Sequence, residues 1–297
     1  MFKLMPVESD PVVYAIPFFI TLIAIELFIN WKEALELYES KEAISSIGMG
    51  LGSLVINVVM KGLAYGAYTY LYQFHIFNIG WHWWAWILIL FADDFTFYWH
   101  HRLSHEIRVL WAAHVNHHSS QTMNLATALR QSWGEQFYKY IWWMWMPLFG
   151  FEPLMMLMMM SISLIYQYWV HTELIKKMPK WFEFLFNTPS HHRVHHASNV
   201  RYLDQNHAGI LIIWDRLFGT FAEEKDEEKP VYGITKNINT YNLFKIASHE
   251  FIDLGKDIKR APAFKDKLKY IFYPPGWSHD GPDLTARKFN TNTRRIL

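Results

Sequence analysis

Residues 101–118 read HRLSHEIRVLWAAHVNHH, and residues 192–196 read HRVHH. Histidines recur there three or four positions apart, in three clusters: His101 with His105, then His114, His117 and His118, then His192, His195 and His196. On a helix this spacing stacks side chains on one face, one turn apart. The clusters therefore predict helical segments whose imidazoles converge on a common point, which indicates a bound metal.

The number of histidines indicates how many metal ions are bound. A zinc site is complete with about four ligands, and a catalytic zinc ion keeps only about three protein ligands. The three clusters supply eight imidazoles. We therefore expect a dinuclear centre.

The composition indicates a membrane protein. Hydrophobic residues make up 52% of the 297 residues and aromatic residues 18%, both above the average for a soluble domain. Three apolar runs, Val12–Asn30, Ile44–Leu71 and Trp81–Trp99, are each long enough for a span of about 20 residues. The first run lacks a basic leader and a small-residue cleavage site, so we expect an anchor and no cleaved signal peptide.

A fourth apolar stretch, residues 140–170, is interrupted by Pro147, Gly150 and Pro153. If it crossed the membrane once, the first two histidine clusters would lie on the opposite side from the third and could not share metals with it. The stretch is short for two full crossings. We therefore expect a hairpin of two half-length or tilted helices that turns near Phe149–Pro153, with protein around the turn.

Basic residues predict the orientation. Lys32 and Lys41 follow the first run, residues 72–80 carry no Lys or Arg, and the histidine segments are flanked by Arg102, Arg108, Arg130, Lys176, Lys177 and Lys180. The positive-inside rule then predicts a cytosolic metal site, at a bacterial inner membrane or the endoplasmic reticulum. A net charge of +1 gives no case for nucleic acid binding, and the absence of Cys excludes disulfides and cysteine-ligated clusters.

These observations predict an all-α fold: an integral membrane helical bundle of three spans plus a broken helical hairpin, with a cytosolic helical cap that holds a histidine-rich dinuclear metal site. The predicted organisation is membrane helices (1–100), a first catalytic cap segment (101–139), a membrane hairpin (140–170), a second catalytic cap segment (171–222) and a cytosolic C-terminal tail (223–297).

The surroundings of the histidines favour oxidation of a lipid. Imidazoles suit iron, zinc, copper or nickel. A site at the membrane face can admit a lipid chain and keep water out. Unactivated C–H bonds need oxidising chemistry, which two iron ions with molecular oxygen supply and zinc cannot, although zinc can occupy the same site as a substitute. A metal transporter is the alternative, but its imidazoles would lie inside the spans, whereas these lie beyond them.

Several motifs resemble the fatty acid hydroxylase (sterol desaturase) superfamily. They are DFTFYWHHRLSH (94–105), LWAAHVNHHS (110–119), PSHHRVHH (189–196) and WDRLFGT (214–220), so the resemblance covers about residues 90–222. Within that region, NLATALRQS (124–132), YQYWVHTE (166–173) and NTP (187–189) are most similar to the alkylglycerol monooxygenase branch, which uses tetrahydrobiopterin and cleaves ether lipids.

The resemblance implies that two iron ions are bound by His101, His105, His114, His117, His118, His192, His195 and His196, with His171 as a ninth imidazole. It also implies that Glu106 is a functional carboxylate and that Arg130 and Gln131 contact the pterin. The implied reaction is hydroxylation of the ether-linked carbon of an alkylglycerol. The alternative is a sterol, hopanoid or fatty acyl hydroxylase or desaturase that receives electrons from a redox protein.

Other polar residues have roles that the sequence alone suggests. Asp94 lies seven residues before His101 on the same helical face, so we expect it to accept a hydrogen bond from a ligand imidazole, and we expect a similar role for Asp215. His100 and His191 point about 100° away from their ligand neighbours and should not bind metal. A structural role is favoured for His207. For Arg130 a salt bridge within the cap competes with a lipid headgroup or pterin contact.

Overall fold

The computed structural model describes residues 10–288, and the regular secondary structure of this part of the chain is helical apart from two isolated β-bridges. Its α-helices are α1 (Pro11–Glu33), α2 (Ser40–Tyr72), α3 (Trp83–Glu106), α4 (Arg108–His118), α5 (Trp145–Leu148), α6 (Pro153–Trp169), α7 (Lys180–Leu185), α8 (Pro189–His195), α9 (Ile213–Phe218), α10 (Leu243–Arg260) and α11 (Phe264–Phe272). Short 3-10 turns lie at η2 (Thr127–Leu129), η3 (Glu135–Phe137), η4 (Lys139–Trp143) and η5 (Val200–Tyr202). The predicted all-α class is confirmed for the described residues.

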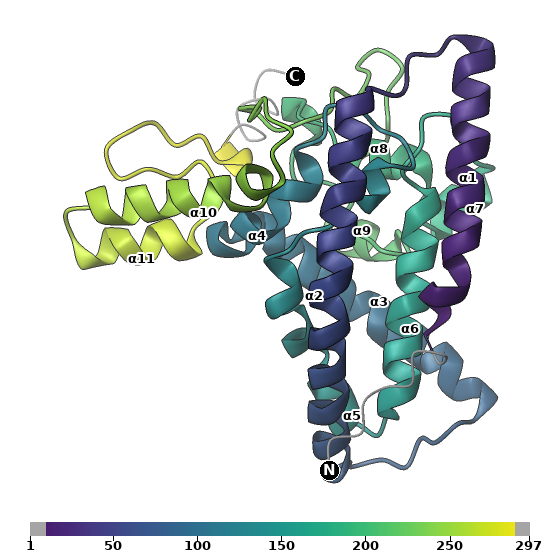
Figure 1. The fold of residues 1–297 in the computed structure, drawn as a ribbon. Helices are drawn as coiled ribbons and strands as arrows, with labels where there is room; N and C mark the ends of the chain where they lie inside the picture. The colour runs from purple at the N-terminus through teal and green to yellow at the C-terminus, as the bar shows by residue number, and fades with distance from the viewer. Residues whose placement is uncertain (1–9, 289–297) are drawn as a thin grey trace.

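The long helices form a bundle in which α6 contacts α1, α2 and α3 (Figure 1). Tyr68 of α2, Ile89 of α3 and Met156 of α6 are fully buried in the core that these helices share. The Tyr68 hydroxyl donates to the carbonyl of Tyr140 at 2.6 Å, so the one polar group of that side chain is satisfied inside the core. The bundle thereby holds the start of the hairpin segment against α2.

Two helices, α1 and α2, are long and apolar enough to cross a membrane. Only 11% of the most apolar window of α1 and 22% of that of α2 are buried in the protein, so most of their apolar side chains face outward. The expected third span forms the first part of α3, which also carries Asp93 and Asp94, and α6 has only 17 residues. A membrane crossing by α3 or by the hairpin stays a prediction.

The hairpin turns where its sequence predicted, between Leu148 at the end of α5 and Pro153 at the start of α6. Gly150 has a φ of +98°, and a Cβ atom there would lie 1.8 Å from the carbonyl oxygen of Phe77, so only glycine fits. The first limb differs from the expected half-length helix. It consists of the 3-10 turn η4 and the four-residue α5, because Pro147 and Gly150 leave no room for a longer helix.

The C-terminal part of the described chain forms a second hairpin, α10 and α11, which projects sideways from the bundle (Figure 1). Arg108 at the start of α4 pairs with Glu250 at 2.9 Å and with Asp257 at 2.7 Å, both on α10. The hairpin is therefore fastened to the helix that carries the second histidine cluster.

Candidate metal centre

Four segments bring the histidines together. Helix α3 carries His101 and His105, α4 carries the second cluster, and α8 carries the third, with His196 at its C-terminal cap. His171 lies just after α6. Helix α8 begins where it does because Pro189 occupies its first turn and the Thr188 side chain accepts a hydrogen bond from the backbone N–H of His191.

The nine histidines form two adjacent groups. The first group is His101, His105, His114, His118 and His195; the second is His117, His171, His192 and His196. In each group one ring nitrogen from every histidine lies within 4.8 Å of the others, and all nine side chains are buried. The rings of His118 and His196 stack at 4.4 Å between centroids, so the two groups are direct neighbours.

The outward ring nitrogens are fixed by oxygen acceptors. Nδ1 of His101 contacts the carbonyl of His207 at 2.8 Å, and Nδ1 of His171 contacts that of Gln167 at 2.8 Å. Nδ1 of His195 lies 2.9 Å from the carbonyl of Gln205. A carbonyl oxygen only accepts, so Nδ1 carries the proton in these three rings and Nε2 presents its lone pair inward.

Between His101 and His114 the inward nitrogens meet without a proton, because Nδ1 of each ring faces an oxygen acceptor, whereas Nδ1 of His192 has no such acceptor. Nε2 of His101 lies 3.1 Å from Nε2 of His114, and Nε2 of His171 lies 2.9 Å from Nε2 of His192. Nε2 of His105 and of His195 are buried without any hydrogen-bond partner. Lone pairs that face one another in a buried site repel unless a cation lies between them, which applies to the first group, and the ring nitrogens of both groups converge closely enough to fit a metal ion in each.

Burial and the neighbouring imidazoles lower the pKa of His117, His118, His192, His195 and His196 well below the ordinary value. The rings are therefore neutral at physiological pH, which is the form that binds metals. Both groups lack carboxylates, and a set of nitrogen donors suits iron, zinc, copper or nickel.

Two carboxylates that the sequence analysis overlooked contact the first group from outside. Oε2 of Glu135 accepts from Nδ1 of His114 at 3.0 Å, and Oδ1 of Asp204 lies 3.3 Å from Nδ1 of His105. Burial raises the pKa of Glu135, but the hydrogen bond from His114 and the nearby His100 outweigh it, so the net shift is downward and the carboxylate is charged. Both residues lie on turns outside the histidine motifs, and no sequence spacing points to them.

Asp94 and Asp215 do not contact an imidazole, contrary to expectation. Asp94 accepts from the backbone N–H groups of Ile210 and Leu211 at 2.7 and 2.9 Å, and from the Trp214 indole at 3.0 Å. Seven residues of helix separate Asp94 from His101 by about 10 Å, too far for a side-chain contact.

Asp215 accepts instead from the backbone N–H groups of His207 and Ala208, at 2.7 and 2.8 Å. Together with Asp94 it holds the loop of residues 207–211. That loop supplies the carbonyl of His207, which fixes the ring of His101. Both aspartates thus orient a ligand through the backbone.

Glu106 contacts arginines and no histidine. Its Oε1 accepts from Arg102 at 3.0 Å and its Oε2 from Arg287 at 2.8 Å. With Asp204 it lines a cavity of about 130 Å³ beside the first group. The structure therefore brings Glu106 close to His105 but gives it no direct contact with a metal-facing nitrogen.

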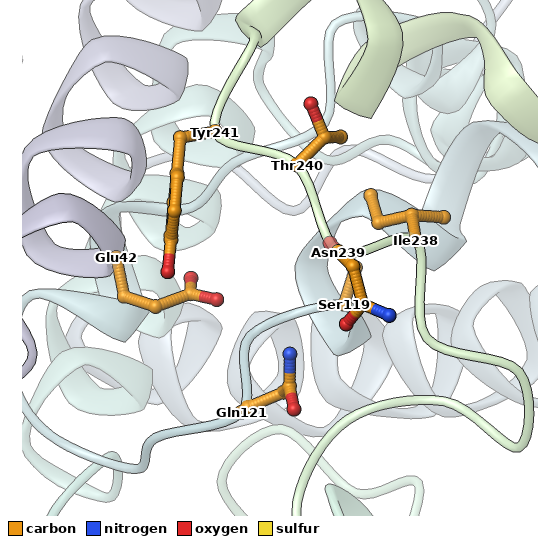
Figure 2. Close-up of a pocket in the computed structure, with 7 residues that line it drawn as sticks. All are labelled: Glu42, Ser119, Gln121, Ile238, Asn239, Thr240 and Tyr241. Atoms are coloured by element: carbon orange, nitrogen blue, oxygen red, sulfur yellow. The ribbon is translucent and has the colours of Figure 1, made fainter.

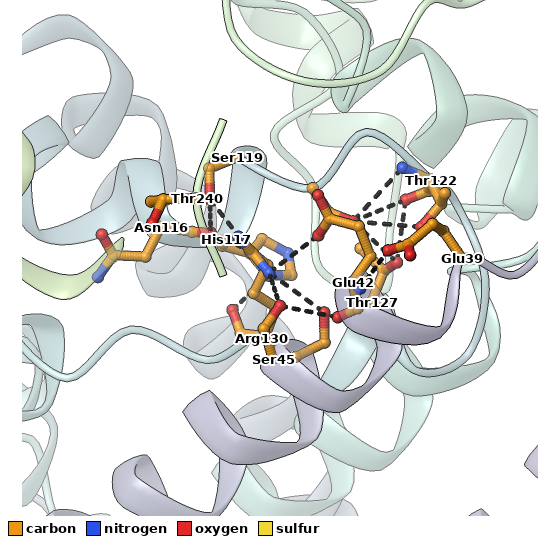
Figure 3. A network of polar contacts seen from close by, with 12 residues as sticks. Glu39, Glu42, Ser45, Asn116, His117, Ser119, Thr122, Thr127, Arg130 and Thr240 are labelled. Atoms are coloured by element: carbon orange, nitrogen blue, oxygen red, sulfur yellow. Dashed lines mark hydrogen bonds and ion pairs between the residues drawn. The ribbon is translucent and has the colours of Figure 1, made fainter. Parts of the chain in front are cut away.

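Arg130 is completely buried and binds protein atoms (Figure 3). Its guanidinium pairs with Glu42 at 3.2 Å and donates to Ser45 at 2.9 Å and to the carbonyl of Asn116 at 3.0 Å. Its own carbonyl accepts from Nδ1 of His117 at 3.2 Å. Gln131 donates to the carbonyl of Ala128. Of the roles weighed for Arg130, the structure shows the salt bridge within the cap.

A polar cavity of about 110 Å³ lies next to this network (Figure 2). It is lined by Glu42, Ser119, Gln121, Ile238, Asn239, Thr240 and Tyr241. Glu42 is shared between the cavity and the ion pair with Arg130, so the cavity is linked to the second histidine group through Arg130 and His117.

The other histidines near the centre lie outside both groups, as expected. His100 is buried with Nε2 3.7 Å from Oε1 of Glu135, and the His191 ring packs against Phe221. His207 has its ring centroid 5.0 Å from that of His105, but its Nε2 lies 3.1 Å from the carbonyl of Asp204. The part of His207 that contacts a grouped histidine is its backbone carbonyl, which accepts from Nδ1 of His101.

Comparison with known proteins places this arrangement in a family. The family model described as fatty acid hydroxylase matches residues 86–220. Alkylglycerol monooxygenase of Homo sapiens is 37% identical over 310 residues, covering 100% of this chain and 69% of that protein. The protein of the same name from Xenopus tropicalis is 36% identical over 285 residues, covering 95% and 63%.

A more distant relative is ornithine lipid hydroxylase OlsE of Rhizobium tropici, 25% identical over 206 residues, covering 68% of this chain and 60% of that protein. No solved structure matches the chain significantly. The chain thus spans 63–69% of the length of the two alkylglycerol monooxygenases compared above. The family match includes all nine grouped histidines, and the human relative aligns with the whole chain, so this protein belongs to the fatty acid hydroxylase (sterol desaturase) superfamily and groups with its alkylglycerol monooxygenase branch.

Proposed function

We propose that the protein is a membrane-bound, oxygen-dependent lipid monooxygenase with a di-iron centre. The observation that carries this proposal is the pair of adjacent histidine groups, whose ring nitrogens converge closely enough to hold a metal ion in each group. Two iron ions bound there would supply the oxygen-activating chemistry that oxidation of an unactivated C–H bond requires.

The residues around the groups keep the site dry. The Trp111 ring lies 5.0 Å from that of His105, and the Phe97 ring lies 5.2 Å from that of His101. These apolar rings exclude water from the inward nitrogens, which protects a reactive centre from side reactions. The backbone carbonyls and carboxylates behind the rings fix the tautomers.

The proposed substrate is an alkylglycerol, the lipid class named in the activity of the two relatives. Insertion of one oxygen atom of O₂ at the carbon next to the ether oxygen gives a hemiacetal, while two electrons and two protons reduce the other atom to water. The hemiacetal then collapses to an aldehyde and the free glycerol lipid.

The proposed location is a membrane with the metal centre at its cytosolic face. The exposed apolar surfaces of α1 and α2 support the membrane, and the basic residues that flank the histidine segments support the cytosolic side.

For the electron donor we propose tetrahydrobiopterin, bound in the cavity between Glu42 and Tyr241. The cavity offers a carboxylate and an aromatic ring to a small polar heterocycle. Arg130 contributes indirectly, because it holds Glu42 in position.

The test is an assay on the purified protein in lipid vesicles. Metal analysis after iron-replete expression should give two ions per chain, and mass spectrometry should detect fatty aldehyde formed from an alkylglycerol only when oxygen and an electron donor, tetrahydrobiopterin or a reduced redox protein, are both present. One ion or none would contradict the dinuclear centre. Two ions without aldehyde would contradict the substrate.

A second candidate is hydroxylation of another lipid with a redox protein as donor, such as a sterol, hopanoid or fatty acyl chain. The similarity to ornithine lipid hydroxylase OlsE favours it. Comparison of lipid extracts from cells with and without the active protein would separate the two candidates, because each leaves a different product.

A further inference from the structure

The α10–α11 hairpin exposes large apolar side chains in a regular pattern. On α11, Phe264, Leu268 and Phe272 recur every four residues and are 74%, 40% and 58% exposed. On α10, Phe244 and Ile252 lie eight residues apart, on the same side of that helix, and are also exposed. We call these five residues the apolar stripe. Nothing within the described residues covers it fully.

The stripe continues the outward apolar surface of α2. Leu243, at the start of α10, packs on Gly48 of α2, and the Phe244 ring lies 5.6 Å from that of Trp133. Trp133 in turn lies against Gly52 of α2. The outward side chains of α2 at this level include Ile47, Leu51 and Val55, all exposed. One apolar surface therefore runs from α2 onto the hairpin.

The hairpin carries an excess of positive charge. Residues 243–273 contain seven Lys and Arg against four Asp and Glu. Two of the four acidic residues, Glu250 and Asp257, are turned inward to Arg108. The exposed basic side chains include Lys256, Lys259 and Lys265. A helix with an apolar face bordered by Lys and Arg is typical of segments that lie in the interface of an anionic membrane.

We propose that the α10–α11 hairpin lies along the bilayer surface, with the apolar stripe among the acyl chains and the basic side chains on anionic headgroups. The hairpin projects across the direction of α2, as a segment in the membrane plane must when α2 crosses it (Figure 1). A symmetric second copy is a poorer occupant, because it would bring the same positive charges together. The inference rests on the proposed membrane location of α1 and α2.

This placement has a consequence for the metal centre. Helix α10 is fastened to α4 through Arg108, and α4 carries His114, His117 and His118. A hairpin held at the bilayer surface therefore fixes the depth of these ligands relative to the lipid, and so the depth at which a lipid chain meets the site.

The sequence contains no Cys, so single-cysteine variants of the full chain can be spin-labelled and placed in vesicles. The test positions are Phe264→Cys and Phe272→Cys, and the matched control on the same hairpin is Asp253→Cys, which is exposed on the side of α10 away from the stripe. Val58→Cys on α2 is the reference for a label exposed to lipid, and Asp226→Cys on an exposed loop is the reference for a label exposed to water.

We expect the labels at 264 and 272 to collide more often with oxygen than with a water-soluble nickel complex, as at position 58, and the label at 253 to show the reverse, as at position 226. The hairpin proposal is overturned if 264 and 272 behave like 253 while 58 reports lipid. If 58 reports water, the membrane location itself fails. Spin–spin broadening between chains at 264 would overturn the proposal in favour of a second copy.

The proposed contact between basic side chains and anionic headgroups is tested with a double variant, Lys265→Glu with Lys267→Glu. In vesicles that contain phosphatidylglycerol we expect this variant to shift the label at 272 toward water, and in phosphatidylcholine alone we expect no shift. An equal response in both lipids would overturn the role of anionic headgroups.

Discussion

Arg130 connects His117 to Glu42: its carbonyl accepts from Nδ1 of His117 at 3.2 Å, while its buried guanidinium pairs with the carboxylate of Glu42 at 3.2 Å. One residue thus fixes a ring of the second histidine group and ties the α4 end of the site to the first turn of α2. The tautomer of His117 and the position of α2 are linked through it.

Replacement of Arg130 by Ala should destabilise the fold. Removal of one partner of a buried ion pair costs about 3–5 kcal/mol, because the other charge is left without a partner. We expect a lower thermal unfolding midpoint and less metal in the second group. Arg201→Ala is the control, since Arg201 pairs with Glu228 on the surface, 42% exposed. Unchanged unfolding of Arg130→Ala would show that the ion pair contributes little.

The two histidine groups predict two distinct losses of metal. His118→Ala should weaken metal binding in the first group and His192→Ala in the second, so each variant should lose metal from one group only while turnover is abolished. His114→Ala and His195→Ala should also abolish turnover. His75 and His279 belong to neither group, so His75→Ala and His279→Ala should keep both ions and nearly full activity. Elemental analysis with an activity assay checks this, and activity in a ligand variant would require a different ligand set.

Glu135→Ala should weaken metal binding by about 10- to 100-fold, because an acceptor that fixes a ligand ring contributes to that extent. The charged carboxylate accepts from Nδ1 of His114, and without it the ring is free to rotate. Glu135→Gln keeps an acceptor, so its metal affinity should lie between that of the unchanged protein and that of Glu135→Ala. Glu227→Ala on an exposed loop is the control. A competition titration with a metal chelator measures the affinities. Equal metal affinities of Glu135→Ala and the unchanged protein would show that Glu135 does not support metal binding.

The sequence predicted the parts of the site that depend on helical periodicity. The spacing of the histidines on α3, α4 and α8 was sufficient to bring them together, because each helix fixes its own face. Glu135 and Asp204 were missed because they reach the rings from turns, and the geometry of a turn is set by tertiary contacts.

Asp94 shows the opposite error. It has the right helical face for His101, but the distance along the helix exceeds the reach of its side chain, and the loop of residues 207–211 comes between them. The apolar runs predicted α1 and α2 correctly. They did not predict the short first limb of the hairpin, where one proline and one glycine outweigh an apolar composition.

Asp94→Asn should loosen the loop of residues 207–211. The carboxylate accepts three N–H groups, and an amide that turns its NH₂ toward them leaves at least one buried donor unpaired, at a cost of about 1–3 kcal/mol. We expect faster hydrogen exchange at Ile210 and Leu211 and reduced activity through the His207 carbonyl. Asp253→Asn is the exposed control. Unchanged exchange at both amides would mean that Asp94 does not hold the loop.

The proposed electron donor predicts a specific phenotype for Tyr241. This residue lines the cavity beside Glu42 and is 46% exposed, so Tyr241→Ala can remove a stacking surface without disturbing the core. We expect a raised KM for tetrahydrobiopterin, an unchanged unfolding midpoint and unchanged metal content. Direct binding of the pterin, followed by its fluorescence, should weaken in parallel. Tyr273→Ala, on an exposed residue beyond α11, is the matched control. If turnover proceeds with a reduced redox protein and no pterin, the ether-lipid proposal fails, while the di-iron hydroxylase proposal survives because it rests on the histidine groups alone.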